Sequence, residues 1–174
     1  MNVDIAQDQV DIILDKARRL RLGPVFEGQR MDAHNISFHE ATFDLVVSCA
    51  ALHHVQHKLE PLKKIRKVLK AGGRLMIADL DMDTTGDHMD LARMKRILDV
   101  LDKVYATRPP AYKHMDRAAF RTVFGSAKKH VLNQGDYCIS FKQWANLCLE
   151  AGFVRVNIKL VPGRECFGIV TATR

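Results

Sequence analysis

Two adjacent histidines, His53 and His54, follow the apolar run Phe43–Val47, which has the composition of a buried strand. An imidazole exchanges its proton near neutral pH, so both are candidate general bases for a reaction at a hydroxyl group. His88 and His114 are further candidates of the same kind. The alternative is that the adjacent pair only shapes a pocket.

The histidines can also be considered as metal ligands. His53 and His57 are four residues apart, a spacing that presents both from one face of a helix. No third ligand and no H-E-x-x-H glutamate accompanies them, so the sequence predicts no metal site. Asp79, Asp81 and Asp83 lack the glycine and the closing glutamate of an EF-hand loop, and calcium is therefore not expected either.

The elements that must position these side chains alternate between strands and helices. Apolar spacing predicts a helix over residues 8–20 and a basic amphipathic helix that starts at about Leu59 and ends at Gly72-Gly73. Short strands are expected at residues 3–5, 25–28, 43–47 and 74–78. This order favours a mostly parallel α/β sheet with helices on its faces.

The C-terminal third predicts a helix followed by a hairpin. Ser140 and Gln143 form a capping-box signature, and Gly152 should end the helix that they open. Residues 154–160 and 167–173 should form two antiparallel strands.

Composition narrows the class of protein. The apolar fraction of 47% is enough for a buried core in 174 residues, and the four cysteines are scattered without a C-x-x-C pair. No secretory signal or membrane span is recognisable, so a cytoplasmic protein is expected. Much of the net charge of +7 lies on the solvent-exposed face of the basic helix, without interleaved aromatic residues, so no nucleic-acid partner and no membrane is expected.

Three motifs accompany the Phe43–Val47 strand: Leu52-His53-His54-Val55, Lys70-Ala71-Gly72-Gly73-Arg74 and Glu150-Ala151-Gly152-Phe153. As a set they resemble the class I S-adenosylmethionine-dependent methyltransferases of the small-molecule type. The resemblance covers residues 1–82 and 138–174. It implies one Rossmann-like domain over residues 1–174, in which residues 83–137 form a helical substrate region, and a small-molecule substrate.

The resemblance also implies where S-adenosylmethionine would bind. In that family an acid at the end of the second strand holds the ribose hydroxyls, and Asp4 with Ile5 stands at this position. Asp32 with Ala33 matches the acid that contacts the adenine amino group. The small residues Ser48 and Cys49 would line the methionine end, with His53 and His54 near the transferred methyl group. Helix-cap or turn roles are the alternative for Asp4 and Asp32.

The sequence departs from the family at its start. A first strand and a G-x-G-x-G loop should precede Asp4, and none of the ten glycines forms such a motif. We therefore expect an N-terminally truncated domain in which the Phe43–Val47 strand lacks its central neighbour. Buried unpaired backbone groups cost about 1–3 kcal/mol each. A missing N-terminal segment, or a homo- or hetero-oligomeric partner, would have to cover that open edge.

Two functions remain open on the sequence. One is an S-adenosylmethionine-dependent methyltransferase whose site is completed from outside these residues. The other is a non-catalytic, methyltransferase-like subunit or relic that acts through protein or ligand binding. A nicotinamide-dependent Rossmann enzyme is disfavoured because the G-x-G-x-x-G turn is absent.

Overall fold

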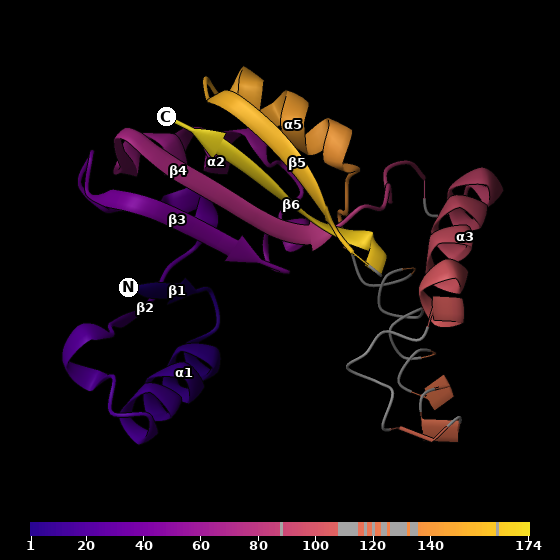
Figure 1. The fold of residues 1–174 in the computed structure, drawn as a ribbon, viewed down its shortest axis with the longest axis horizontal. Coiled ribbons are helices and arrows are strands. Elements are labelled where there is room, and N and C mark those ends of the chain that lie inside the picture. Colours follow the sequence, from indigo (N-terminus) through magenta and orange to yellow (C-terminus); the bar gives the residue numbers. More distant parts are fainter. Residues whose placement is uncertain are drawn as a thin grey trace. The chain divides into compact units, whose positions relative to one another are not determined.

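The computed structural model describes residues 1–87, 89–107, 115–116, 118–119, 121–122, 125, 132, 136–162 and 164–174. The chain divides into two compact units, Met1–His39 and Glu40–Arg174, which are described separately (Figure 1). The single domain expected over residues 1–174 stays a prediction.

The first unit is a small strand–helix–strand motif. Strand β1 (Asn2–Asp4) pairs in parallel with β2 (Gly28–Arg30), and helix α1 (Gln7–Arg19) connects them. The helix confirms the predicted apolar spacing, with Val10 and Ala17 buried. The second strand begins later than predicted, because Gly23–Val25 forms a 3-10 turn (η1) instead. A side chain at Gly28 would lie 3.1 Å from Leu14, so this glycine permits the close approach of β2 to α1.

The second unit contains a four-stranded sheet in the order β3-β4-β6-β5 (Figure 1). Its strands are β3 (Phe43–Cys49), β4 (Leu69–Leu80), β5 (Val154–Val161) and β6 (Arg164–Thr173). The predicted α/β fold and C-terminal hairpin are confirmed. Only β3 and β4 pair in parallel, whereas β6 runs antiparallel to both β4 and β5. This sheet is therefore mixed rather than mostly parallel, because the hairpin supplies two of its three pairings.

Two helices, α2 (Leu59–Val68) and α5 (Phe141–Glu150), pack on this sheet and on each other. Alternate residues of β4 are buried, as expected for a strand with one covered face. The fully buried residues of this core come from both helices and from β4 and β6: Leu62, Leu69, Leu75, Ile77, Trp144, Cys148 and Val170. Burial of each such side chain contributes about 1.5–3 kcal/mol, so this core holds β4 and β6 against the two helices.

The helix ends agree with the sequence in one case and differ in the other. At α5, Ser140 and Gln143 form the predicted capping box, and Gly152 closes the helix with a φ of +89°. Helix α2 instead ends at Val68, and Gly72-Gly73 lies inside β4. A side chain at Gly73 would come within 2.8 Å of the Lys70 carbonyl oxygen, so the glycines serve a bulge in the strand and not a helix cap.

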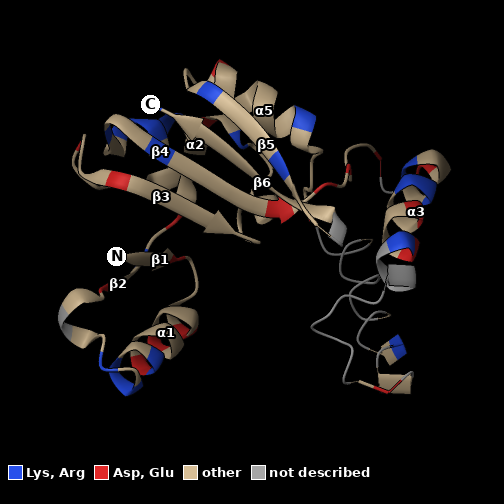
Figure 2. Ribbon diagram, viewed as in Figure 1, with Lys and Arg blue, Asp and Glu red and all other residues tan. Residues whose placement is uncertain are grey.

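Helix α3 (Leu91–Thr107) lies in the predicted helical region 83–137. Ile97 and Leu101 of α3 pack with Met82 and Cys138 in a small apolar cluster. No helix in the described part of the chain is long and apolar enough to cross a membrane. Lys and Arg occur on α1, α3 and α5 as well as on α2 (Figure 2).

Candidate active site

The parallel pairing of β3 and β4 places the histidines. Cys49 pairs with Ala78, so both strands end at the same edge of the sheet. Ala50 then takes a left-handed conformation with φ +48°, and its amide donates to the Ala78 carbonyl 2.9 Å away. This conformation costs about 1–2 kcal/mol for a residue with a side chain. It turns the chain sharply into a 3-10 turn, η3 (Leu52–His54), beside the end of β4.

His53 and Asp79 form a buried hydrogen-bonded pair at this edge. The His53 Nδ1 lies 2.7 Å from the Asp79 Oδ1, and their side chains are 10% and 1% exposed. The amide of Leu80 donates to the same oxygen at 2.8 Å, which fixes the carboxylate. With Nδ1 donating to Asp79, Nε2 is left as the basic nitrogen of the ring. Asp79 was noted in the sequence only as a calcium candidate, and no motif linked it to His53.

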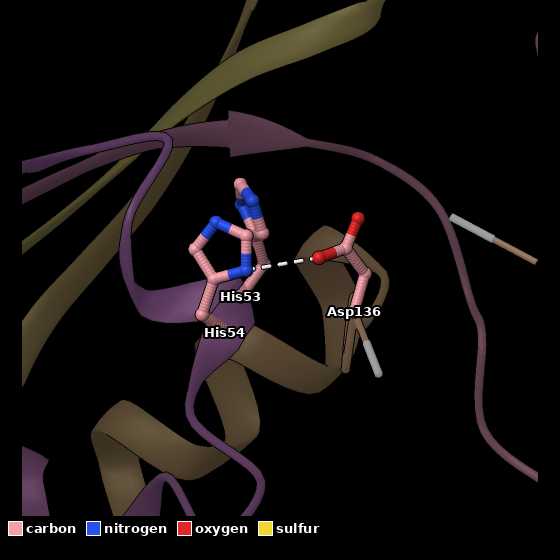
Figure 3. A group of neighbouring side chains, drawn as sticks. All are labelled: His53, His54 and Asp136. Carbon is pink, nitrogen blue, oxygen red and sulfur yellow. Dashed lines mark ion pairs between the residues drawn. The ribbon is translucent and has the colours of Figure 1, made fainter. Parts of the chain in front are cut away.

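His54 makes a second pair with an acid that sequence reasoning missed. Its Nδ1 lies 2.9 Å from the Asp136 Oδ1, and the two histidine rings are 4.2 Å apart between centroids (Figure 3). Asp136 is buried, whereas the His54 side chain is 53% exposed. The Tyr137 amide donates to the His53 carbonyl at 2.8 Å, which holds the 136–138 segment against η3. Asp136 lies far along the chain in a segment without a motif, so no sequence signal could have identified it.

A buried lysine borders the His53–Asp79 pair. Lys58 is 5% exposed, donates to the Val55 carbonyl, and has its ammonium 5.5 Å from the Trp144 ring centre and 5.9 Å from that of Tyr137. Burial lowers the pKa of Lys58 from 10.5 to about 8, although electrostatic interaction with Cys138 and Asp79 opposes the shift. No local pattern in the sequence identified this lysine, because its burial depends on Trp144 and Tyr137, which lie far along the chain.

The predicted cofactor residues of this unit lie at the end of β3. The Ser48 hydroxyl is buried without a hydrogen-bond partner among the described residues, and Cys49 is exposed. A buried hydroxyl of this kind is suited to a polar ligand at the strand end. The structure therefore brings Ser48 and Cys49 to the same strand end that leads into η3.

The other predicted cofactor residues lie in the first unit. Asp4 ends β1, and its Oδ1 accepts from the Ala6 amide at 2.9 Å. Asp32 follows β2 and caps the 3-10 turn η2 (Ala33–Asn35), with its Oδ1 accepting from the His34 amide at 2.8 Å. Ile5 is exposed and Ala33 is half-buried. Asp4 is the last residue of β1 and Asp32 follows β2, so both acids lie at the same end of two neighbouring parallel strands. Each acid also accepts a hydrogen bond from a nearby backbone amide, which is the turn role considered as the alternative.

The remaining histidine candidates fall elsewhere. His57 is exposed and lies before α2, so it does not share a helix face with His53. His88 and His114 lie outside the described residues. The i, i+4 metal pair considered from the sequence therefore has no helix to present it.

Comparisons with known proteins match parts of the chain to methyltransferases. Residues 1–77 match the family model described as a methyltransferase domain. An uncharacterized methyltransferase of Schizosaccharomyces pombe is 31% identical over 86 residues, which are 46% of this chain and 30% of that protein. A demethylmenaquinone methyltransferase of Staphylococcus saprophyticus is 22% identical over 139 residues, 79% of this chain and 58% of the relative. The chain thus spans less than two thirds of the length of these curated relatives.

A solved structure shows the same fold. The S-adenosylmethionine-dependent methyltransferase from Aquifex aeolicus superposes with a TM-score of 0.60 at 19% identity, covering 98% of this chain and 66% of that one. The family match and the fold agree with the motifs around Phe43 and Gly72-Gly73. Residues 1–77 of the chain therefore match the methyltransferase domain family, and the chain shares its fold with an S-adenosylmethionine-dependent methyltransferase.

Proposed function

We propose that the protein transfers a methyl group from S-adenosylmethionine to a hydroxyl-bearing small molecule, with His53 as the proton acceptor. The observation that carries this proposal is the 2.7 Å contact between His53 Nδ1 and Asp79 Oδ1 at the shared end of β3 and β4. A histidine oriented by a buried carboxylate is suited to general-base chemistry.

The chain's own residues would act on the proton. Asp79 accepts the Nδ1 proton and holds the imidazole with Nε2 basic. S-adenosylmethionine, when bound, supplies a methyl group on a positively charged sulfur. His53 Nε2 would accept the hydroxyl proton of the substrate as the substrate oxygen is methylated. The carboxylate of Asp79 then stabilises the imidazolium, because the pair is 10% and 1% exposed and little water screens the two charges.

We propose that Ser48 and Cys49 of the second unit bind the methionine half of the cofactor. Separately, for the first unit, we propose that Asp4, Ile5, Asp32 and Ala33 bind an adenosine group. The unpartnered buried hydroxyl of Ser48 supports the first assignment, since such a group gains a partner when a polar ligand binds. Two acids after neighbouring parallel strands support the second, because ligands bind beyond the carboxyl ends of such strands.

We also propose that the cofactor site needs a glycine-rich backbone segment from outside these 174 residues, from further chain or from a partner subunit. No two of the ten glycines make a G-x-G motif, and among the described residues β3 pairs with β4 alone. The edge of β3 that pairs with no strand among the described residues could accept one more strand.

Calorimetric titration with S-adenosylmethionine tests the proposal. The 174-residue chain should bind weakly or not at all. A chimaera that adds a strand and a G-x-G-x-G loop before Met1 should bind with a Kd in the micromolar range. Micromolar binding by the chain without the added segment would overturn the requirement for outside backbone.

Labelled methyl transfer tests the activity itself. The same chimaera should transfer a labelled methyl group to some member of a panel of phenols and other hydroxyl compounds. Cofactor binding without transfer to any hydroxyl compound would instead support the non-catalytic, ligand-binding alternative.

A further inference from the structure

His53, His54 and Asp136 each bring one potential ligand atom to a common point, and these three atoms all lie within 4.8 Å of one another (Figure 3). We propose that this group binds a divalent transition-metal ion of the Zn²⁺ class. The inference goes beyond methyl transfer and does not depend on it, because it concerns a binding site that can be measured without any substrate.

The donor set selects the class of metal. Two imidazole nitrogens and one carboxylate oxygen are typical of Zn²⁺ and related transition metals, whereas Mg²⁺ and Ca²⁺ prefer oxygen ligands throughout. Three protein ligands leave one position of a tetrahedral ion open. The His54 side chain is 53% exposed, so an ion can reach the group from solvent on the His54 side. Asp136 is buried and holds its ligand atom inside the protein.

The surrounding contacts hold two of the three ligands in place. Asp79 binds His53 through Nδ1, which leaves Nε2 for a metal and reproduces the carboxylate–histidine–metal arrangement common in metalloproteins. The Thr84 hydroxyl donates to the Asp136 carbonyl at 2.7 Å, and the Tyr137 amide donates to the His53 carbonyl at 2.8 Å. The backbones that carry His53 and Asp136 are therefore tied together before any ion arrives.

The distances suit a small ion after a modest side-chain adjustment. Metal bonds of about 2.0–2.1 Å at a tetrahedral angle place ligand atoms roughly 3.3 Å apart. His54 Nδ1 and Asp136 Oδ1 are 2.9 Å apart, and no pair in the group is separated by more than 4.8 Å. The His54 side chain is 53% exposed, and rotation of its ring would bring the ligand atoms to these separations.

Metal binding and proton acceptance would compete for one atom. An ion on His53 Nε2 removes the lone pair that the proposed methyl transfer requires. Occupancy of the site would thus inhibit transfer rather than assist it.

Calorimetric titration of the 174-residue chain with ZnCl₂ tests the site. We expect one Zn²⁺ per chain, and we expect His54→Ala and the isosteric Asp136→Asn each to weaken binding by about tenfold or more. Asp79→Asn should weaken it by about 10–100-fold, because the carboxylate that orients the His53 ring is lost. The matched control is His57→Ala, which removes an exposed histidine three residues from His54 and should leave binding unchanged.

Cobalt(II) absorption identifies the ligands. Nitrogen and oxygen ligation gives visible bands without a thiolate charge-transfer band, and these bands should disappear in Asp136→Asn. Absence of stoichiometric binding, loss of binding in His57→Ala with retention in His54→Ala, or a thiolate band from the exposed Cys49 would each overturn the proposal. Circular dichroism of each variant separates loss of the site from loss of the fold.

Discussion

The buried ammonium of Lys58 should make stability depend on pH in a defined direction. Its pKa is lowered from 10.5 to about 8, mainly by burial. Between these two values the unfolded chain holds a proton that the folded chain has released, so the free energy of unfolding rises with pH. Below about pH 8 the lysine is charged in both states and the full cost of burying that charge is present.

The size of the effect follows from the pKa difference. One pKa unit corresponds to about 1.4 kcal/mol, so most of the change falls between pH 7 and pH 10 and amounts to about 2 kcal/mol. The variant Lys58→Met removes this titration and retains the apolar stem that packs beside Trp144. The free energy of unfolding of the native chain minus that of Lys58→Met should therefore increase by about 2 kcal/mol over this range.

Urea unfolding followed by fluorescence measures this difference. Trp144 is the single tryptophan of the chain and is fully buried beside the ammonium, so its emission reports on the relevant core. Lys63→Met, at an exposed position on α2, controls for removal of one positive charge. A difference between native and Lys58→Met that is flat from pH 7 to pH 10, or that falls, would refute the burial of a charged lysine in this core.

Two further predictions concern the same unit. Burial raises the pKa of Cys138 from 9.0 to about 12, with the negative charges of Asp79 and Asp136 adding to the shift. A folded-state pKa raised in this way gives stability that is present below pH 9 and is lost as the pH rises toward 12. The stability of the native chain relative to Cys138→Ala should therefore fall by about 1 kcal/mol between pH 8 and pH 10 in urea titrations, and a rise would contradict it. Ser140→Ala removes the α5 capping box and should lower the free energy of unfolding by about 1 kcal/mol, whereas Ser140→Asp should largely preserve it; equal losses in both variants would exclude capping as the cause.

Local patterns predicted the elements of this fold well. The apolar spacing of residues 8–20, the β-branched run after Phe43 and the Ser140–Gln143 signature each act within a few residues, and each gives the expected element in the structure. The Gly72-Gly73 pair was misassigned because glycine serves a helix end and a strand bulge equally well. The pairing of β4 with Phe43 and Leu45 decides between a helix end and a strand bulge. Phe43 and Leu45 lie far from the two glycines in sequence, so no local pattern could show this pairing.

The sequence predicted only part of the candidate active site, because several of its contacts join residues that lie far apart in the chain. His53 and His54 were identified from their place after a strand. Their acidic partners depend on tertiary contacts: Asp79 on the register of β3 against β4, and Asp136 on the hydrogen bonds that hold its segment to η3. Burial of Lys58 likewise depends on where Trp144 and Tyr137 lie, which no local pattern specifies.

The central proposal is that His53 accepts the proton during methyl transfer, and one rate comparison tests it most directly. The measurement is kcat for labelled methyl transfer at saturating S-adenosylmethionine, in the glycine-loop chimaera with and without His53→Gln. We predict a loss of about 10²–10⁴-fold in kcat with an unchanged calorimetric Kd for the cofactor, and little change for the exposed control His57→Gln. An unchanged kcat in His53→Gln, or a loss explained entirely by weaker cofactor binding, would contradict the proposal.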